Sequence, residues 1–143
     1  LEDTHPELSL LPSKAIDRAH VRSMAYQIAM EIHPLNNPRV TQFLTSKMDV
    51  TEAEKLHWYH HWVDVGFTAL ERRLTLSESN GRFCFGDSVS LADICLIPQV
   101  YNALRFNCPL QNYPTICAIY DHCHRIPAFV SASPETQSDY PAE

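Results

Sequence analysis

Glycine is scarce in this sequence, which has only three among its 143 residues. Glycine adopts the positive φ angles of tight turns more readily than other residues, so little material is present for such turns. Strand-like alternation of apolar and polar residues is also absent, whereas long stretches are rich in strong helix formers. We therefore expect an all-α domain, a helical bundle.

Positive charge is sparse as well. The sequence has 11 lysine and arginine residues against 17 aspartate and glutamate residues, a net charge of −6, and no basic run. Nucleic acids and anionic membrane surfaces attract basic patches, so neither is an expected partner. No apolar run approaches the roughly 20 residues of a membrane-spanning helix, and no signal peptide is visible.

The cysteines lack the spacing of a disulfide framework or a zinc knuckle. Their number is odd and no C-x-x-C pair occurs; they are Cys84, Cys95, Cys108, Cys117 and Cys123. Disulfides persist in oxidising compartments, whereas thiols stay reduced in the cytoplasm. We expect free thiols and a cytoplasmic protein.

One domain with one core fits this length and a composition of 45% hydrophobic and 20% charged residues. The opening "LEDTHPE" is typical of the tail of a helix that breaks at Pro6, followed by a linker to Pro12. We expect residues 13–133 to form the helical domain and residues 134–143 to form a polar, loosely held tail.

Helix-start signals divide this domain. Ser13 is the expected N-cap of a helix that runs to Ile32 and that Pro34 should end. Thr51 and Glu54 form a capping box at the start of a long helix with one apolar face. Further helices are expected over residues 38–46, from Pro114, and over residues 127–133.

The helix within "GDSVSLADICLIPQVYNALRF" (residues 86–106) has the strongest start signal. Ser90 and Asp93 form an S-x-x-D capping box, in which each side chain can bond the backbone of the other residue. The lone pairs of such a carboxylate are committed, so we expect Asp93 to be structural rather than a general base. Pro98 lies inside this helix and should kink or loosen it.

This capped helix, central in an all-α domain, resembles the C-terminal domain of the glutathione transferases. Together with "IHPLNN", "HWVDVGFTALE" and "YPTICAI" it is similar to the zeta class of that family, over essentially the whole chain. In that class an N-terminal thioredoxin-like domain ends in sequence like "LEDTHPE" and holds the serine/cysteine motif that activates the thiol. No stretch here resembles that motif. The resemblance implies that residues 1–12 are the end of that domain and a linker, that its other residues are absent from this chain, and that no catalytic residue lies in the chain.

The resemblance implies that the intact two-domain protein isomerises maleylacetoacetate to fumarylacetoacetate in tyrosine and phenylalanine breakdown. Glutathione would be the cofactor: its thiolate adds to the double bond, the resulting single bond rotates, and the thiol is expelled. The class is dimeric, so a homodimer is expected, and the chain by itself should be inactive. Two alternatives are a glutathione transferase of broad specificity and a non-catalytic, transferase-like interaction module.

Arg105 is the main candidate for substrate binding. A guanidinium group stays charged and can hold a carboxylate through two parallel hydrogen bonds. The resemblance implies that the arginine of "N-x-x-R-F" anchors one carboxylate of a small dicarboxylate substrate. The alternative is an arginine that faces solvent or interacts with the dipole of its own helix.

A second candidate group lies in "EIHPLNNPRV". The residues matching His33, Asn37, Pro38 and Arg39 approach glutathione in the zeta class, which implies cofactor binding here. On this reading His33 forms hydrogen bonds and is not a general base. Asn37 can equally cap the helix that follows it, and the two roles can coincide.

No metal site is expected. His57 and His61 can share one face of a helix, but they lack the H-E-x-x-H arrangement of a zinc site. The histidines of "HCH" (residues 122–124) are neighbours on a helix, so their side chains fan apart. We interpret all of them as ordinary interior or surface histidines.

Overall fold

The computed structural model describes residue 2, residues 4–77 and residues 81–140. Within these ranges the chain is helical and has no strand, which confirms the all-α prediction. All five cysteines are free. No helix in the described ranges combines the length and the apolar character that a membrane-spanning segment requires.

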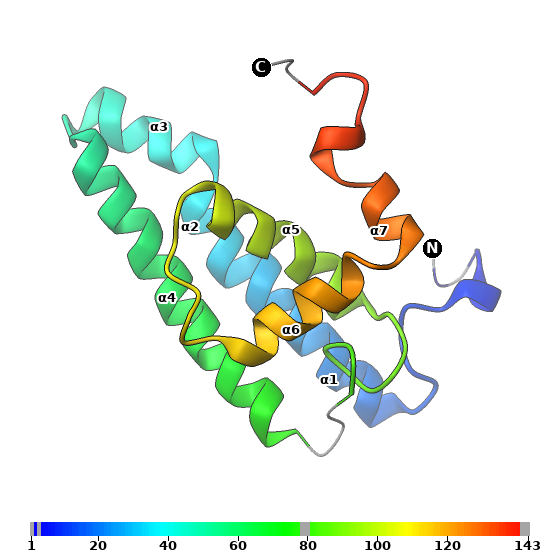
Figure 1. The fold of residues 1–143 in the computed structure, drawn as a ribbon. Helices are drawn as coiled ribbons and strands as arrows, with labels where there is room; N and C mark the ends of the chain where they lie inside the picture. Colours follow the sequence, from blue (N-terminus) through cyan, green and yellow to red (C-terminus); the bar gives the residue numbers. More distant parts are fainter. Residues whose placement is uncertain (1, 3, 78–80, 141–143) are drawn as a thin grey trace.

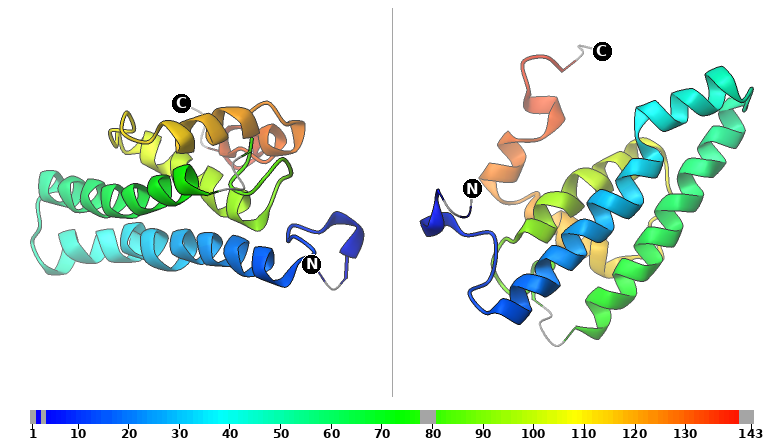
Figure 2. Two further views of the ribbon diagram at one scale, coloured as in Figure 1. Left: turned by 90° about the horizontal axis from the view of Figure 1, so that it is seen from below. Right: turned by 180° about the vertical axis from the view of Figure 1, so that it is seen from behind.

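Two long helical paths lie side by side and run in opposite directions (Figures 1 and 2). The first path consists of α1 (Ala15–Tyr26), the π-helix η2 (Gln27–Ile32) and α2 (His33–Asn36). A short helix, α3 (Pro38–Lys47), turns the chain into the second path, α4 (Glu52–Leu76). This hairpin forms one layer of the domain.

The second layer contains α5 (Leu91–Arg105) and α6 (Pro114–Cys123). Helix α5 packs against α1 and η2, while α6 packs against α4 and α5. Figure 1 shows α7 (Pro127–Ser131) and the tail beyond α5, on the side away from α4. Two 3₁₀ turns, η1 (Pro6–Leu8) and η3 (Pro134–Thr136), complete the described elements.

The predicted apolar face of α4 forms the centre of the core. Its residues Tyr59, Val63, Phe67, Leu70 and Leu74 are buried, and the Phe67 ring meets the Tyr113 ring edge-on at 5.6 Å. Leu56, the first residue of the predicted face, is 38% exposed. The buried face, which repeats every 3.6 residues, thus extends along α4 from Leu74 back to Tyr59 and ends before Leu56, near the start of the helix.

Two predicted helix starts or stops are wrong at the beginning of the chain. The N-cap of α1 is Lys14 rather than Ser13, and it makes no side-chain capping bond. In the described residues before Pro6 the structure has turns instead of a helix tail. The Glu2 carboxylate accepts bonds from the Leu10 N–H and the Ser9 hydroxyl, both at 2.7 Å, which folds this segment back on itself.

Pro34 does not end the first helix, contrary to expectation. The π-helix η2 precedes it, and the His33 N–H donates to the Ile28 carbonyl five residues earlier. The wider π turn accommodates a proline, whose ring would otherwise crowd the carbonyl of Met30 and which has no N–H to donate. The helical path therefore continues to Asn36, two residues past the proline.

The start of α5 forms as predicted. The capping box of Ser90 and Asp93 is present, and the Asp93 side chain is fully buried. Its carboxylate accepts from the Ser90 N–H (2.8 Å), the Ser90 hydroxyl (2.7 Å) and the Cys84 N–H (2.8 Å). Asp93 therefore joins the loop before the helix to the first turn of α5. The helix then continues through Pro98 to Arg105.

The first residues of the polar tail, 134–137, make more contacts than the polar composition of the tail predicts. The nearby Glu135 carboxylate raises the pKa of Tyr101 in α5, while the Glu135 backbone N–H and, to a smaller extent, Tyr101 lower the pKa of Glu135. The Thr136 hydroxyl donates to the Ser133 carbonyl at 2.8 Å, and the Gln137 amide donates to the Ser131 carbonyl at 3.0 Å.

We predict that Asp93→Ala destabilises the fold far more than Ser90→Ala. Loss of the carboxylate leaves the buried Cys84 and Ser90 N–H groups without acceptors, which should cost about 3 kcal/mol or more. Loss of the Ser90 hydroxyl should cost about 1 kcal/mol. Urea unfolding followed by far-UV circular dichroism measures both values. Equal effects would show that the third bond, to Cys84, adds nothing.

Gly66 allows α4 to pack closely against η2, because it has no side chain. A Cβ atom at this position of α4 would collide with Cγ1 and Cδ1 of the buried Ile32 in η2. Alanine gains about 1 kcal/mol of helix propensity over glycine, but such a collision costs about 1–3 kcal/mol. We expect Gly66→Ala to destabilise the protein in urea unfolding, and to do so less in an Ile32→Val background. A net gain in stability would mean that α4 simply moves away.

Candidate functional site

A cavity of about 390 Å³ lies at the end of the bundle where α2, α3, α4 and α5 meet. The lining residues are His33, Asn36, Pro38, Thr41, Gln42, Lys55, Leu56, Tyr59, Asn102, Arg105 and Phe106.

The structure brings three predicted site residues together in this lining: His33, Pro38 and Arg105. Asn37 lies next to them, with its amide nitrogen 3.4 Å from His33 Nε2, and its side-chain oxygen accepts from the Arg39 N–H at 3.1 Å. Asn37 is thus the N-cap of α3, as the sequence suggested. Arg39 is exposed and is not part of the lining.

The position of Arg105 follows from how α5 ends. Asn107 adopts a left-handed conformation (φ 54°), and its N–H donates to the Leu104 carbonyl at 2.9 Å. The next N–H, that of Cys108, reaches back to the Ala103 carbonyl at 2.9 Å. These two bonds make a Schellman motif, and asparagine tolerates the required backbone conformation. Arg105 therefore occupies the last helical position, at the mouth of the cavity.

Two side chains of α4 fix the neighbouring backbone. His60 Nε2 lies 2.8 Å from the Phe106 carbonyl, just beyond the end of α5. The indole N–H of Trp58 donates to the Leu35 carbonyl of α2 at 2.9 Å. Helix α4 thus holds both walls of the cavity, the one that carries Arg105 and the one that carries His33.

The charge of the lining is positive. Arg105 and Lys55 are its cations, and no aspartate or glutamate belongs to it. Lys55 is paired with Glu52, whereas Arg105 makes no ion pair with any residue that the structure describes. An exposed guanidinium without an acidic partner beside a concave surface is suited to bind a carboxylate.

The floor of the cavity is aromatic. The Tyr59 ring stacks on the Phe106 ring with centroids 4.2 Å apart. Burial raises the pKa of Tyr59 to about 12, with a further increase from Cys108 and a smaller opposing effect of the Arg105 charge. The Tyr59 phenol therefore stays neutral at physiological pH and forms an uncharged wall below the cations.

Asn36 is the most unusual residue in the lining. It is only 7% exposed, and neither its Nδ2 nor its Oδ1 atom has a hydrogen-bond partner among the residues that the structure describes. Leaving a buried polar group unpaired typically costs about 1–3 kcal/mol. An amide in this position is therefore unfavourable for the fold and requires an explanation.

Sequence reasoning missed Asn36, Lys55 and Asn102. A signal existed for Asn102, which lies three residues before Arg105 and therefore on the same face of α5. Lys55 lies four residues before Tyr59 and shares its face of α4 in the same way. Asn36 stands next to the predicted Asn37, but only the packing of α2 shows which of the two amides is buried.

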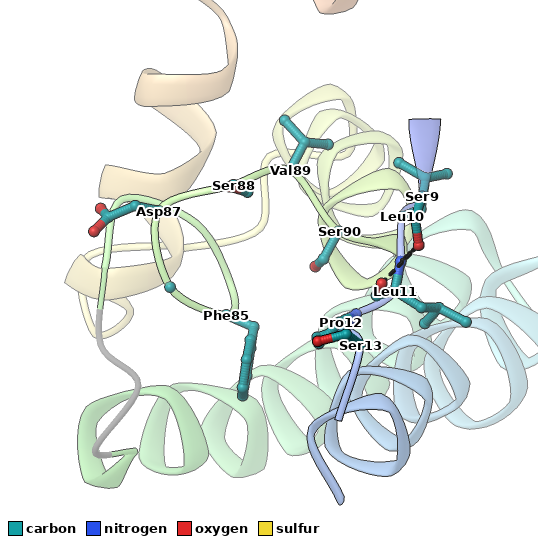
Figure 3. Close-up of a pocket in the computed structure, with 11 residues that line it drawn as sticks. Ser9, Leu10, Leu11, Pro12, Ser13, Phe85, Asp87, Ser88, Val89 and Ser90 are labelled. Atoms are coloured by element: carbon teal, nitrogen blue, oxygen red, sulfur yellow. Dashed lines mark hydrogen bonds between the residues drawn. The ribbon is translucent and has the colours of Figure 1, made fainter. Parts of the chain in front are cut away.

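A second hollow of about 350 Å³ lies between the segment 9–13 and the loop 85–90 (Figure 3). Its lining has no lysine or arginine, and its one carboxylate, on Asp87, points away from the segment 9–13. The Ser9 hydroxyl is already engaged, because its oxygen lies 2.7 Å from both the Glu2 carboxylate and the Leu11 carbonyl and its one proton can be donated to either. The Leu91 N–H donates to the Leu10 carbonyl at 2.9 Å, so this hollow marks where the N-terminal segment docks on the start of α5.

The histidines of α4 do not form a metal centre in the part of the chain that the structure describes. His57 and His61 are both exposed, and the His61 ring packs edge-on against Trp62 with centroids 4.9 Å apart. No group of three or more histidine, cysteine, aspartate or glutamate side chains converges within the described residues.

Comparison with known proteins shows the family of this chain. Residues 35–131 match the family described as "Glutathione S-transferase, C-terminal domain". The chain belongs to the glutathione S-transferase family. It is 44% identical over 139 residues to a probable maleylacetoacetate isomerase of Vibrio cholerae, an alignment that covers 97% of this chain and 64% of that protein. The chain thus spans less than two thirds of the length of this relative.

Two solved structures show the same fold. A maleylpyruvate isomerase described as a bacterial zeta-class glutathione transferase is 38% identical, with a TM-score of 0.96 over 99% of this chain and 66% of that one. This match confirms the predicted resemblance to the zeta class. A maleylacetoacetate isomerase of Anaeromyxobacter dehalogenans is 35% identical, with a TM-score of 0.91 over 99% of this chain and 62% of that one. It was crystallised with dicarboxyethyl glutathione and citrate in its active site.

The residues at this end of the bundle fit part of a glutathione site. Glutathione is an anionic tripeptide with amide and carboxylate groups, and it needs hydrogen-bond donors and acceptors. His33 and Asn37 provide such a polar pair beside the cavity.

We predict that the cavity binds small dicarboxylates. Malonate is a suitable probe because it is saturated and offers no double bond to a thiol. Arg105→Gln should weaken malonate binding in calorimetry by about tenfold or more, because a hydrogen bond to a charged group is worth about 1.5–3 kcal/mol. Lys55→Gln should have a smaller effect, since Glu52 already pairs with Lys55. The reverse order would identify Lys55 as the main anchor.

Proposed function

We propose that the intact protein is a glutathione-dependent cis–trans isomerase of maleylacetoacetate, which it converts to fumarylacetoacetate. The observation that carries this proposal is Arg105, a cation without an acidic partner in the described chain, at the mouth of a cavity whose lining has no carboxylate. The names of the relatives at 35–44% identity support the same reaction. Maleylacetoacetate has a carboxylate at each end, so a single anchored end still leaves the other free to move.

In this proposal glutathione supplies the thiol that adds reversibly to the double bond and so permits rotation. Arg105 holds one carboxylate of the substrate through two parallel hydrogen bonds. The fixed end of α5 keeps that carboxylate in place while the other half of the molecule swings round. The stacked rings of Tyr59 and Phe106 exclude water from one side of the reacting bond without adding a charge.

The other assignments complete the proposal. Residues 1–12 would be the end of a thioredoxin-like domain and its linker, residues 13–133 the helical domain and residues 134–143 its tail. His33, Asn37, Pro38 and Arg39 would face glutathione, most of whose site would lie in the preceding domain. The protein would form a homodimer, as the resemblance to the zeta class implies. A cytoplasmic location is in keeping with the five free thiols, because a reducing compartment preserves them.

Maleylpyruvate is a second candidate substrate, favoured by the TM-score of 0.96 to a maleylpyruvate isomerase. It shares the cis double bond and the two terminal carboxylates, so Arg105 would bind both compounds in the same way. The two differ in chain length between the double bond and the distal carboxylate. Relative kcat/KM values for the two compounds would distinguish them.

The test is an isomerase assay on the full-length protein with each substrate. We expect turnover that requires glutathione and leaves its concentration unchanged. Arg105→Ala should lower kcat/KM about ten- to hundredfold, because it removes a charge-assisted hydrogen-bond pair worth about 1.5–3 kcal/mol. Arg82→Ala is the matched control, since Arg82 is exposed and pairs with Asp87 in a loop outside the cavity.

Three outcomes would contradict the proposal. Consumption of glutathione with unrelated acceptors would favour a transferase of broad specificity. A folded protein with no thiol-dependent activity would favour an interaction module. Glutathione-dependent turnover by residues 1–143 without any further domain would contradict the expectation that this chain is inactive by itself.

A further inference from the structure

The buried amide of Asn36 has no function in the fold that the structure reveals. Asn37, not Asn36, caps α3, and the α2 residue held by α4 is Leu35, through its carbonyl and Trp58. Asn36 nevertheless lies in the cavity lining with both amide atoms inaccessible and unpaired. A leucine of similar size would fill the same space without these unpaired groups, so packing does not account for an asparagine.

We infer that Asn36 is a ligand-binding residue: its side chain, closed off from solvent in this structure, turns toward the cavity when a ligand enters, so that Nδ2 donates to an oxygen of the dicarboxylate that Arg105 anchors. This inference rests on the proposed function, because it concerns the same cavity. The ligand would place one carboxylate on the Arg105 guanidinium and a second oxygen, from a carboxylate or a keto group, on Asn36. The residue would then determine specificity for ligands that carry two separated oxygen functions.

The chemistry of the lining favours this arrangement. The two cations, Arg105 and Lys55, come from α5 and α4, whereas Asn36 comes from α2. An anion in the cavity is therefore approached by donors from three helices. A buried N–H donor discriminates strongly, because a ligand without the matching oxygen leaves it unpaired. A neutral amide adds this discrimination without a third positive charge.

Gln99 provides an internal comparison. It is 3% exposed and its amide atoms are also unpartnered, but it lines a neighbouring cavity of about 270 Å³. That cavity shares His33 and Asn102 with the first one and contains neither Arg105 nor Lys55. Gln99 thus has the same chemistry and burial as Asn36 without the cations that attract a carboxylate.

The experiment measures malonate binding and thermal stability in the full-length protein with glutathione present. Asn36→Leu should raise the Kd of malonate at least tenfold in calorimetry, while the melting temperature of the ligand-free protein stays equal or rises. Gln99→Leu is the matched control and should leave the Kd within twofold of the original value. Asn36→Ala removes the N–H donor without adding a charge, so it should weaken malonate binding as well. This variant tests the inference even if Asn36→Leu fails to fold.

Several results would overturn the inference. One is an unchanged malonate Kd in Asn36→Leu or Asn36→Ala; another is an equal loss in Gln99→Leu. A crystal structure in which one ordered water satisfies Asn36 both with and without malonate would also overturn it, as would failure of the unaltered protein to bind malonate. The isomerase assay is independent of these measurements. Malonate binding that depends on Asn36, without isomerase activity, would refute the proposed reaction and leave the ligand-binding role of Asn36 intact.

Discussion

The arrangement of this domain depends on one buried carboxylate, that of Asp93. It accepts three hydrogen bonds, two from Ser90 and one from the Cys84 N–H, and so fixes both the start of α5 and the loop before it. A carboxylate with no solvent contact is stable only when such donors satisfy it. Because α5 is one continuous helix from Leu91 to Arg105, the direction set at Asp93 influences where Arg105 lies at the opposite end, 12 residues later.

Long-range polar contacts hold the other helices in a similar way. Glu71 of α4 is buried and accepts from the N–H groups of Thr115 and Ile116, at 2.8 and 2.9 Å, so it caps the N-terminus of α6 from another helix. A negative charge at that end also complements the helix dipole. Arg73, by contrast, reaches from α4 to the Ser23 hydroxyl of α1 at 2.9 Å. Helix α4 thus organises the bundle, with apolar packing at its centre and polar contacts along its sides.

The cavity lies at the end of the bundle where the apolar packing around α4 ends. The π-helix η2 allows the first helical path to pass Pro34, which carries His33 and Asn36 to the same end of the bundle as Arg105. Gly66 permits α4 to approach η2 closely, while Leu56 is already partly exposed beside the cavity. Within the described residues, this end of the domain has an arginine without an acidic partner and a buried amide without a hydrogen-bond partner. Such departures from stable packing are expected where a protein binds a ligand.

The sequence by itself determined the helical class, most helix starts and the apolar face of α4, because capping boxes and period-3.6 burial depend on residues close together in the chain. The resemblance carried by "IHPLNN" and "PQVYNALRF" also indicated Arg105 and the His33 segment. Local signals failed at Ser13 and Pro34, where the limits depend on Lys14 and on a π turn. Only the tertiary structure decided that Lys55, Asn102 and the buried Asn36 share a cavity with Arg105. Convergence of side chains from four helices is set by packing between distant segments, for which a single sequence has no local pattern.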